Sequence, residues 1–235
     1  MFSFKRFSIL VIAVVVTAAT AAAQSGSARE MTVEESYLQE AIELMIIRET
    51  ARSNTREQKL ISLEYIKDAL DRGNTNDEIR QTLAFLTEEG RRTVTIESGR
   101  ITNNFPDVRR LATRFLGQVG TDEARRSLLD ILQFENEPMV IQEAVRALGI
   151  IGKNEDNQTA IHIAWVLERY DNTNPDNLLA LAGIDALESI ARANNGLNSP
   201  EAVRILFRIS ENYTYMTPVR ERARQLLADL RRFGN

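Results

Sequence analysis

His162 is the single histidine of the chain and the side chain best suited to proton transfer, because an imidazole titrates near neutral pH. A catalytic base needs a nucleophile or an orienting carboxylate beside it, and no motif around His162 provides either. The sequence also lacks a nucleophile elbow and a phosphate-binding glycine loop. We therefore interpret His162 as a non-catalytic residue on a helix and predict that the protein is not an enzyme.

The run Asp171-Asn-Thr-Asn-Pro-Asp176 offers several oxygen atoms and is the best candidate for a cation-binding loop. It lacks the glycine and the distant bidentate glutamate of an EF-hand, which favours a solvated turn. The chain has no cysteine, which removes most routes to zinc or a transition metal, although carboxylates alone could bind calcium or magnesium. We predict no metal site and no cofactor.

The N-terminus has the pattern of a secretory signal peptide over residues 1–23. Lys5 and Arg6 precede an apolar run over residues 7–16, and small residues follow up to the predicted cleavage site after Ala23. An uncleaved anchor is the alternative, but the apolar run is shorter than the roughly 20 residues that span a bilayer. The sequence predicts a periplasmic or secreted protein with no integral membrane segment after cleavage, beginning with a flexible tether over residues 24–31.

Loss of Lys5 and Arg6 would change the formal charge of the chain from −4 to −6. An acidic protein is not attracted to the phosphate backbone, so we expect no nucleic-acid partner. Without cysteine an exported chain has no disulfide, and its stability must come from packing.

Helical periodicity dominates the rest of the chain. Over residues 32–90 we expect three helices, beginning at Thr32, Arg56 and Asn76, of which the first carries a capping box. Residues 91–104 interrupt this pattern with an alternation typical of a strand, which predicts a long loop or a short extended insert. All five prolines (Pro106, Pro138, Pro175, Pro200 and Pro218) are expected near helix starts, where the missing N–H costs no hydrogen bond.

An internal repeat extends over residues 105–235. Shifting Pro106 onto Pro138 aligns apolar, arginine and glycine positions, namely Val108 with Val140, Ala112 with Ala144, Arg114 with Arg146, Leu116-Gly117 with Leu148-Gly149, and Gly120 with Gly152. Each such helix is followed by a second one, at residues 122–134, 156–170 and 200–210. Thr121, Ser199 and Thr217 precede helix starts and are expected to cap them.

These Pro-x-Val and Leu-Gly marks resemble the HEAT-repeat family, including its bacterial HEAT-like members. The resemblance implies an all-α fold, a right-handed α-solenoid of helix pairs in which each pair packs mainly on the next. Residues 32–90 have the layout of helix pairs without the marks and are interpreted as degenerate repeats. In this family, residues at the positions of Arg109, Arg114 and Arg146 usually pair with acids of neighbouring repeats.

The second helices predict a binding surface. Aligned on Ala124, Ala160 and Ala202, they carry an apolar core stripe, and positions +2, +5 and +9 project away from it. These positions provide the candidate partner-binding residues Arg126, Leu129, His162, Trp165, Arg169, Arg204 and Phe207. Leu129, Trp165 and Phe207 would form an apolar ladder on the concave face, where aromatic and arginine side chains are frequent anchors. The alternative is that position +5 packs against the adjoining repeat.

We therefore predict an exported, non-catalytic scaffold or adaptor that binds a protein partner through its concave face, with self-assembly also open. Two other interpretations remain: a structural component of an envelope or surface appendage, and a lyase-like or enzyme accessory module, as some HEAT-like proteins handle small molecules. The last would need a concave pocket with a polar centre.

Overall fold

The computed structural model describes residues 32–233, which form parts of two compact units divided after Ile42. The predicted signal peptide (1–23) and tether (24–31) lie outside the described residues. In the first unit, helix α2 (Val33–Arg52) begins with the predicted capping box. The Thr32 N–H donates to Glu35 Oε2 at 3.0 Å, and the Glu35 N–H donates to Thr32 Oγ1 at 3.2 Å.

The second unit, residues 43–235, holds the last turns of α2 and the helices that follow it. Their bounds are α3 (Arg56–Asp71), α4 (Asp77–Thr87), α5 (Pro106–Val119), α6 (Asp122–Phe134), α7 (Pro138–Ile151), the short 3-10 helix η1 (Glu155–Asn157), α8 (Gln158–Thr173), α9 (Asn177–Ala193), α10 (Pro200–Glu211) and α11 (Thr217–Phe233). The two predicted helices over residues 56–90 are confirmed as α3 and α4.

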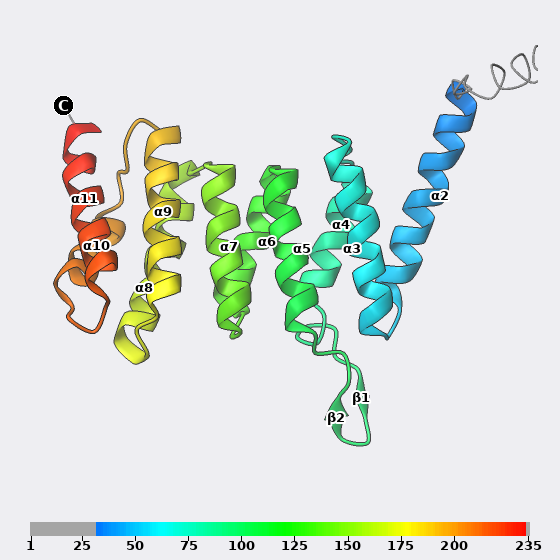
Figure 1. The fold of residues 1–235 in the computed structure, drawn as a ribbon, viewed down its shortest axis with the longest axis horizontal. Helices are drawn as coiled ribbons and strands as arrows, with labels where there is room; N and C mark the ends of the chain where they lie inside the picture. The colour runs from blue at the N-terminus through cyan, green and yellow to red at the C-terminus, as the bar shows by residue number, and fades with distance from the viewer. Residues whose placement is uncertain (1–31, 234–235) are drawn as a thin grey trace, which may run out of the picture. The chain divides into compact units, whose positions relative to one another are not determined.

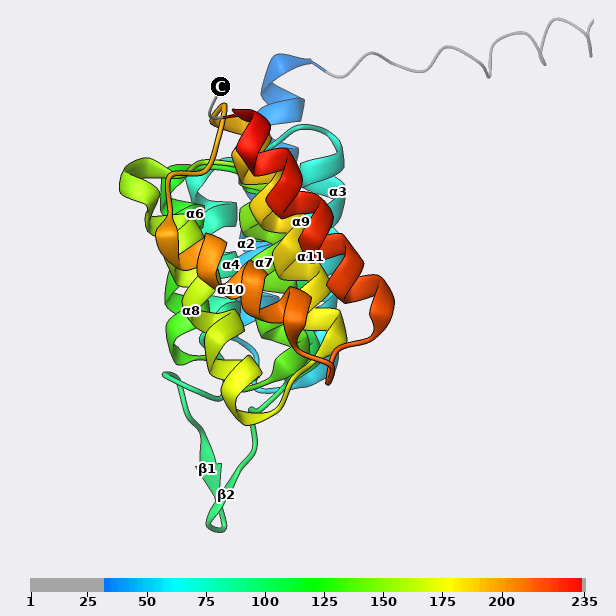
Figure 2. The same ribbon diagram turned by 90° about the vertical axis from the view of Figure 1, so that its left-hand side faces the viewer.

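Within this unit the helices form two rows. One row consists of α3, α5, α7, α9 and α11, in which each helix contacts the next, and the other consists of α4, α6, α8 and α10 (Figure 1). A view along the stack separates the two rows, with α8 and α10 on one side and α9 and α11 on the other (Figure 2). The predicted all-α solenoid of helix pairs is confirmed, while its handedness stays a prediction.

Proline lies in the first turn of a helix, as expected, at four of the five positions. Pro106, Pro138 and Pro200 are the first residues of α5, α7 and α10. Pro218 is the second residue of α11, whereas Pro175 lies in the turn before α9, whose N-cap is Asp176. The first turn tolerates proline because its backbone nitrogen has no intrahelical acceptor to donate to.

The repeated Leu-Gly marks lie where the first helices approach one another most closely. A Cβ atom added to Gly117 of α5 would lie 2.9 Å from the Ala147 Cα of α7. One added to Gly149 of α7 would lie 2.8 Å from the Ala186 Cα of α9. These glycines allow backbone-to-backbone contact between successive repeats, which explains why the pattern carries a glycine at this position.

Residues 91–104 form an extended insert, with strands β1 (Ile96–Glu97) and β2 (Arg100–Ile101) paired antiparallel. The hairpin extends beyond the ends of the neighbouring helices in both views (Figures 1 and 2). Buried Asn103 fixes its base, because its side-chain amide donates to Glu89 Oε1 and to the Thr93 carbonyl, each at 2.6 Å. Of the two predicted forms, the short extended insert is the one observed.

A continuous apolar core runs between the two rows of the second unit, from Ile47 of α2 to Leu226 of α11. It is built from the small and aliphatic residues that recur at helical spacing. Among residues 32–233, no helix has both the length and the apolar character needed to cross a membrane.

Candidate functional site

Helices α6, α8 and α10, which carry all the candidate binding residues, are fixed at their starts by side-chain caps. Thr121 Oγ1 accepts from the Ala124 N–H at 3.2 Å, and Ser199 Oγ accepts from the Ala202 N–H at 3.3 Å, as predicted. In α8 the acceptor is Asn154 Oδ1, bound by the Ala160 N–H at 3.1 Å. Each cap thus satisfies the N–H of the alanine used to align the three helices.

Thr217 differs from the other two predicted caps. It is the first residue of α11, and its hydroxyl accepts from the Arg220 guanidinium at 3.1 Å. The α11 start therefore has no cap from Thr217, because the hydroxyl faces a side chain of its own first turn.

Trp165 and Phe207 are exposed, as the candidate surface requires. Trp165 of α8 keeps 45% of its surface accessible and Phe207 of α10 keeps 61%. The same helices expose Ile161 and Val203 one turn earlier, at equivalent positions of the two repeats. Because α8 and α10 are neighbours, these four residues define one surface, which we call the α8–α10 apolar surface.

Leu129 does not share this exposure, since only 8% of its surface is accessible and it lies in the core. The buried positions of α6 fall at 0, +1, +4, +5, +7 and +8 relative to Ala124, whereas those of α10 fall at 0, +3, +4, +7 and +8 relative to Ala202. Helix α6 is therefore rotated about its own axis relative to α10, and its position +5 faces the core. Of the three residues of the predicted ladder, Trp165 and Phe207 are exposed and Leu129 is not.

Basic side chains border the α8–α10 apolar surface. The Arg169 guanidinium lies 5.0 Å from the centre of the Trp165 ring, which is a cation–π contact. Arg204 and Arg126 are exposed on α10 and α6. His162 is half-buried, with Nδ1 2.8 Å from the carbonyl of Gln158, a local contact within α8 that brings no carboxylate or nucleophile to the ring.

Arg109 and Arg114 both form ion pairs with glutamates, but only Arg114 pairs with a neighbouring repeat as the resemblance implied, since Glu135 follows α6 in the repeat of Arg109 itself. Arg109 Nε lies 2.9 Å from Glu135 Oε2, and both side chains are buried. Arg114 Nε lies 2.8 Å from Oε1 of Glu143 in the next repeat. Arg146 is instead exposed on α7, and over residues 32–233 no acidic group forms an ion pair with it.

Both oxygens of the buried Glu135 carboxylate have partners. Burial opposes its charged form, but the N–H groups of Glu137 and Asn136 and the Arg109 guanidinium outweigh it and lower the pKa of Glu135. Oε1 accepts from the N–H groups of Asn136 and Glu137 at 2.9 and 3.1 Å. The carboxylate therefore closes the turn after α6 while it neutralises Arg109.

The candidate cation loop is engaged in other contacts. Asp171 lies inside α8 and not in a turn, where Oδ2 is 2.6 Å from the Arg208 guanidinium and Oδ1 accepts from Asn212 at 2.9 Å. Asp176 caps α9 by accepting from the N–H groups of Leu178 and Leu179. Within residues 32–233, no group of three or more metal-binding side chains is assembled.

Comparison with known families bears on the repeat pattern. Residues 98–188, which include strand β2, helices α5 to α8 and most of α9, match the family model for HEAT repeats. These residues are HEAT repeats. The predicted HEAT-repeat relationship is confirmed, and HEAT repeats are commonly protein-interaction scaffolds. No curated protein and no solved structure gives a match to the chain.

Ile161 and Val203 were missed by the sequence analysis, although a signal for them existed. They follow Ala160 and Ala202 directly, at position +1 of the same alignment that selected Trp165 and Phe207. The residue of α6 at this position is Arg125, which is charged and buried. An alignment of all three helices therefore does not show an apolar position +1, although Ile161 and Val203 share it in α8 and α10.

Proposed function

We propose that this protein is an exported, non-catalytic HEAT-repeat scaffold that binds a protein partner through the α8–α10 apolar surface. The observation that supports this most is the exposure of Trp165 and Phe207 at equivalent positions of two neighbouring repeats. The exposed Trp165 and Phe207 side chains would gain favourable free energy if an interface buried them. Large aromatic side chains of this kind are common anchors of protein interfaces.

The border of this surface indicates the chemistry of the partner. Arg169 lies over the Trp165 ring, and Arg204 is exposed beside the apolar residues of α10. A partner segment with apolar side chains at its centre and carboxylates at its edge would complement both features. The proposed partner is therefore a protein with an acidic, apolar-centred docking segment.

Export is proposed on the sequence of residues 1–23, with its two cations, apolar run and small residues before Gln24. Intact-mass measurement of the protein purified from its native cells tests it. A mature chain that begins at Gln24 in the periplasmic or extracellular fraction supports export, and a chain that retains residues 1–23 in the cytoplasm contradicts it.

Partner binding is tested by affinity capture from native envelope extracts with three versions of the protein. The double variant Trp165→Ala/Phe207→Ala removes the anchors, and Ile150→Ala/Leu178→Ala removes two exposed apolar side chains from the other row of helices. Proteins captured by the wild type and the control, but lost from the first variant, support the proposal. Equal capture by all three, or none by any, contradicts it.

The alternative to binding another protein is self-assembly, in which the α8–α10 apolar surface would contact a second copy of the chain. Light scattering over a range of protein concentrations separates the two cases. A mass that stays at one chain supports an adaptor for another protein, and a mass that rises with concentration and falls again in Trp165→Ala/Phe207→Ala supports assembly of copies.

A further inference from the structure

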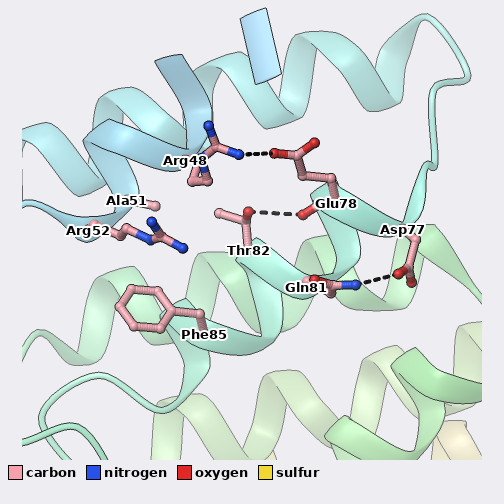
Figure 3. A pocket seen from close by; sticks show the side chains of 8 residues that line it. All are labelled: Arg48, Ala51, Arg52, Asp77, Glu78, Gln81, Thr82 and Phe85. Carbon is pink, nitrogen blue, oxygen red and sulfur yellow. Dashed lines mark hydrogen bonds and ion pairs between the residues drawn. The ribbon is translucent and has the colours of Figure 1, made fainter. Parts of the chain in front are cut away.

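A cavity of about 540 Å³ lies between the last turn of α2 and helix α4, within the second unit (Figure 3). This volume is typical of small-molecule sites. The cavity is far along the chain from the α8–α10 apolar surface and plays no part in the proposed protein binding. Its walls are formed by Arg48, Ala51 and Arg52 from α2, and Asp77, Glu78, Gln81, Thr82 and Phe85 from α4.

Buried Lys59 holds the two walls of this cavity in place. Its side chain is 1% exposed, and Nζ donates to the Ala51 carbonyl of α2 at 2.8 Å. The same Nζ lies 5.5 Å from the centre of the Phe85 ring of α4 and 3.0 Å from Glu89 Oε2, which neutralises its charge. The position of the aromatic ring at the cavity is therefore set by contacts from within the core.

The acidic residues of the cavity already have cationic or amide partners. Arg48 forms an ion pair with Glu78 Oε1 across the two helices at 3.2 Å. Asp77 Oδ1 lies 2.6 Å from the Arg80 guanidinium and Oδ2 accepts from Gln81; hydrogen bonds from these two groups lower the pKa of Asp77. The only oxygen of these two carboxylates without such a partner is Oε2 of Glu78.

Arg52 is the cation of the cavity whose charge is not compensated. Within residues 32–233 no acidic group pairs with it, and its guanidinium points into the cavity, next to the Phe85 ring (Figure 3). A guanidinium offers two parallel N–H donors, which match the two oxygens of a carboxylate. The cavity thus places one free planar cation beside an aromatic ring, with a free carboxylate oxygen on the opposite wall.

We propose that this cavity binds an α-amino carboxylate with an apolar side chain, the chemistry shared by a free amino acid and the C-terminal residue of a peptide. The ligand carboxylate would pair with Arg52, its nitrogen would donate to Glu78, and its side chain would lie on Phe85. Phosphate is disfavoured, because Asp77 and Glu78 repel its second negative charge and it has no N–H donor or apolar part.

The test is isothermal titration calorimetry of the protein with four probes. N-acetyl-L-phenylalanine carries the carboxylate, the N–H and the side chain; its amide lacks the carboxylate; L-phenylalanine carries an ammonium group; inorganic phosphate is the fourth. We expect the acetylated acid to bind at least about tenfold more tightly than its amide, as a charge-assisted bidentate pair predicts. Tighter binding of L-phenylalanine identifies the source as a free amino acid, and tighter binding of the acetylated acid identifies a peptide terminus.

Arg52→Gln is the diagnostic variant, and Arg146→Gln, another exposed arginine on a different helix, is its matched control. We expect Arg52→Gln to weaken the binding of N-acetyl-L-phenylalanine at least about tenfold while its urea midpoint stays that of the wild type, and Arg146→Gln to change neither. Wild-type affinity in Arg52→Gln, equal binding of acid and amide, tighter binding of phosphate, or no binding of any probe overturns the proposal.

Discussion

Nε of Arg109 lies 2.9 Å from Oε2 of Glu135, and each side chain is only 1% exposed, so that two opposite charges are buried together at the end of α6. Arg109 also donates from Nη1 to the Glu89 carbonyl and to Asn104 Oδ1, at 3.1 and 2.8 Å. This one guanidinium joins α5 to both ends of the hairpin insert and to the turn after α6.

Removal of one partner of this pair should be costly. Arg109→Ala leaves the buried Glu135 carboxylate with Arg91, 3.3 Å away and partly exposed, as its remaining cationic partner. We expect a loss of about 3 kcal/mol in the free energy of unfolding, measured by urea denaturation. Arg114→Ala is the control, because Arg114 is 44% exposed in its pair with Glu143 and should cost about 1 kcal/mol. Equal losses in the two variants would contradict a special role for the buried pair.

The lowered pKa of Glu135 predicts how stability depends on pH. A carboxyl group with a lower pKa in the folded state stabilises the fold fully above its unfolded pKa, about 4.3, and loses this contribution as the pH falls through the folded value. Glu135→Gln should therefore be less stable than the wild type at pH 7, and the difference should narrow as the pH falls from about 4.5. Urea midpoints at pH 7, 5, 4 and 3 would check this, and a constant difference would refute it.

The close approach of α5 to α7 predicts the effect of adding one methyl group. Gly117→Ala places a Cβ against the Ala147 backbone, and we expect a loss of about 1–3 kcal/mol in the free energy of unfolding despite the better helix propensity of alanine. Gly183→Ala of α9 is the control, since its Cβ would meet the side-chain tip of Leu167, which can move. Thermal denaturation should rank Gly117→Ala well below Gly183→Ala, and the reverse order would exclude the backbone contact as the cause.

Phe207 and Leu206 are adjacent on α10, but Phe207 lies on the proposed binding surface and Leu206 lies in the core. Phe207→Ala should change the free energy of unfolding by no more than about 0.5 kcal/mol, because the ring lies mostly in water. Leu206→Ala should cost about 2–5 kcal/mol, because that side chain is completely buried. A large loss from Phe207→Ala in chemical denaturation would mean that the ring supports the fold and is not held free for a partner.

Several features of the fold could be predicted because they depend on local chemistry. Pro106, Pro138 and Pro200 mark helix starts since only the first turn tolerates a missing N–H. The repetition of glycine at positions 117 and 149 is visible in the sequence. Its cause, the backbone contact of each glycine with the next first helix, is visible only in the structure.

Other features depend on the rotation of each helix about its axis relative to its neighbours, which cannot be inferred from the periodicity of the sequence. Position +5 is inward at Leu129 and outward at Trp165, because α6 is rotated about its axis relative to α8. Lys59 looks like an ordinary exposed lysine in the sequence, and only the packing of α2, α3 and α4 buries it against Glu89. The cavity beside Arg52 escaped the sequence analysis for the same reason, since its walls come from separate helices.

The central claim, that the α8–α10 apolar surface docks a protein, is tested most directly by photo-crosslinking in the native cells. Val203→p-benzoylphenylalanine places the reactive group on α10 one turn before the anchor Phe207, and Leu178→p-benzoylphenylalanine places it on an exposed site of α9. We predict a discrete crosslinked protein from position 203 that is absent from position 178 and lost when Trp165→Ala is added. No crosslink at position 203, or the same products from both positions, would contradict the account.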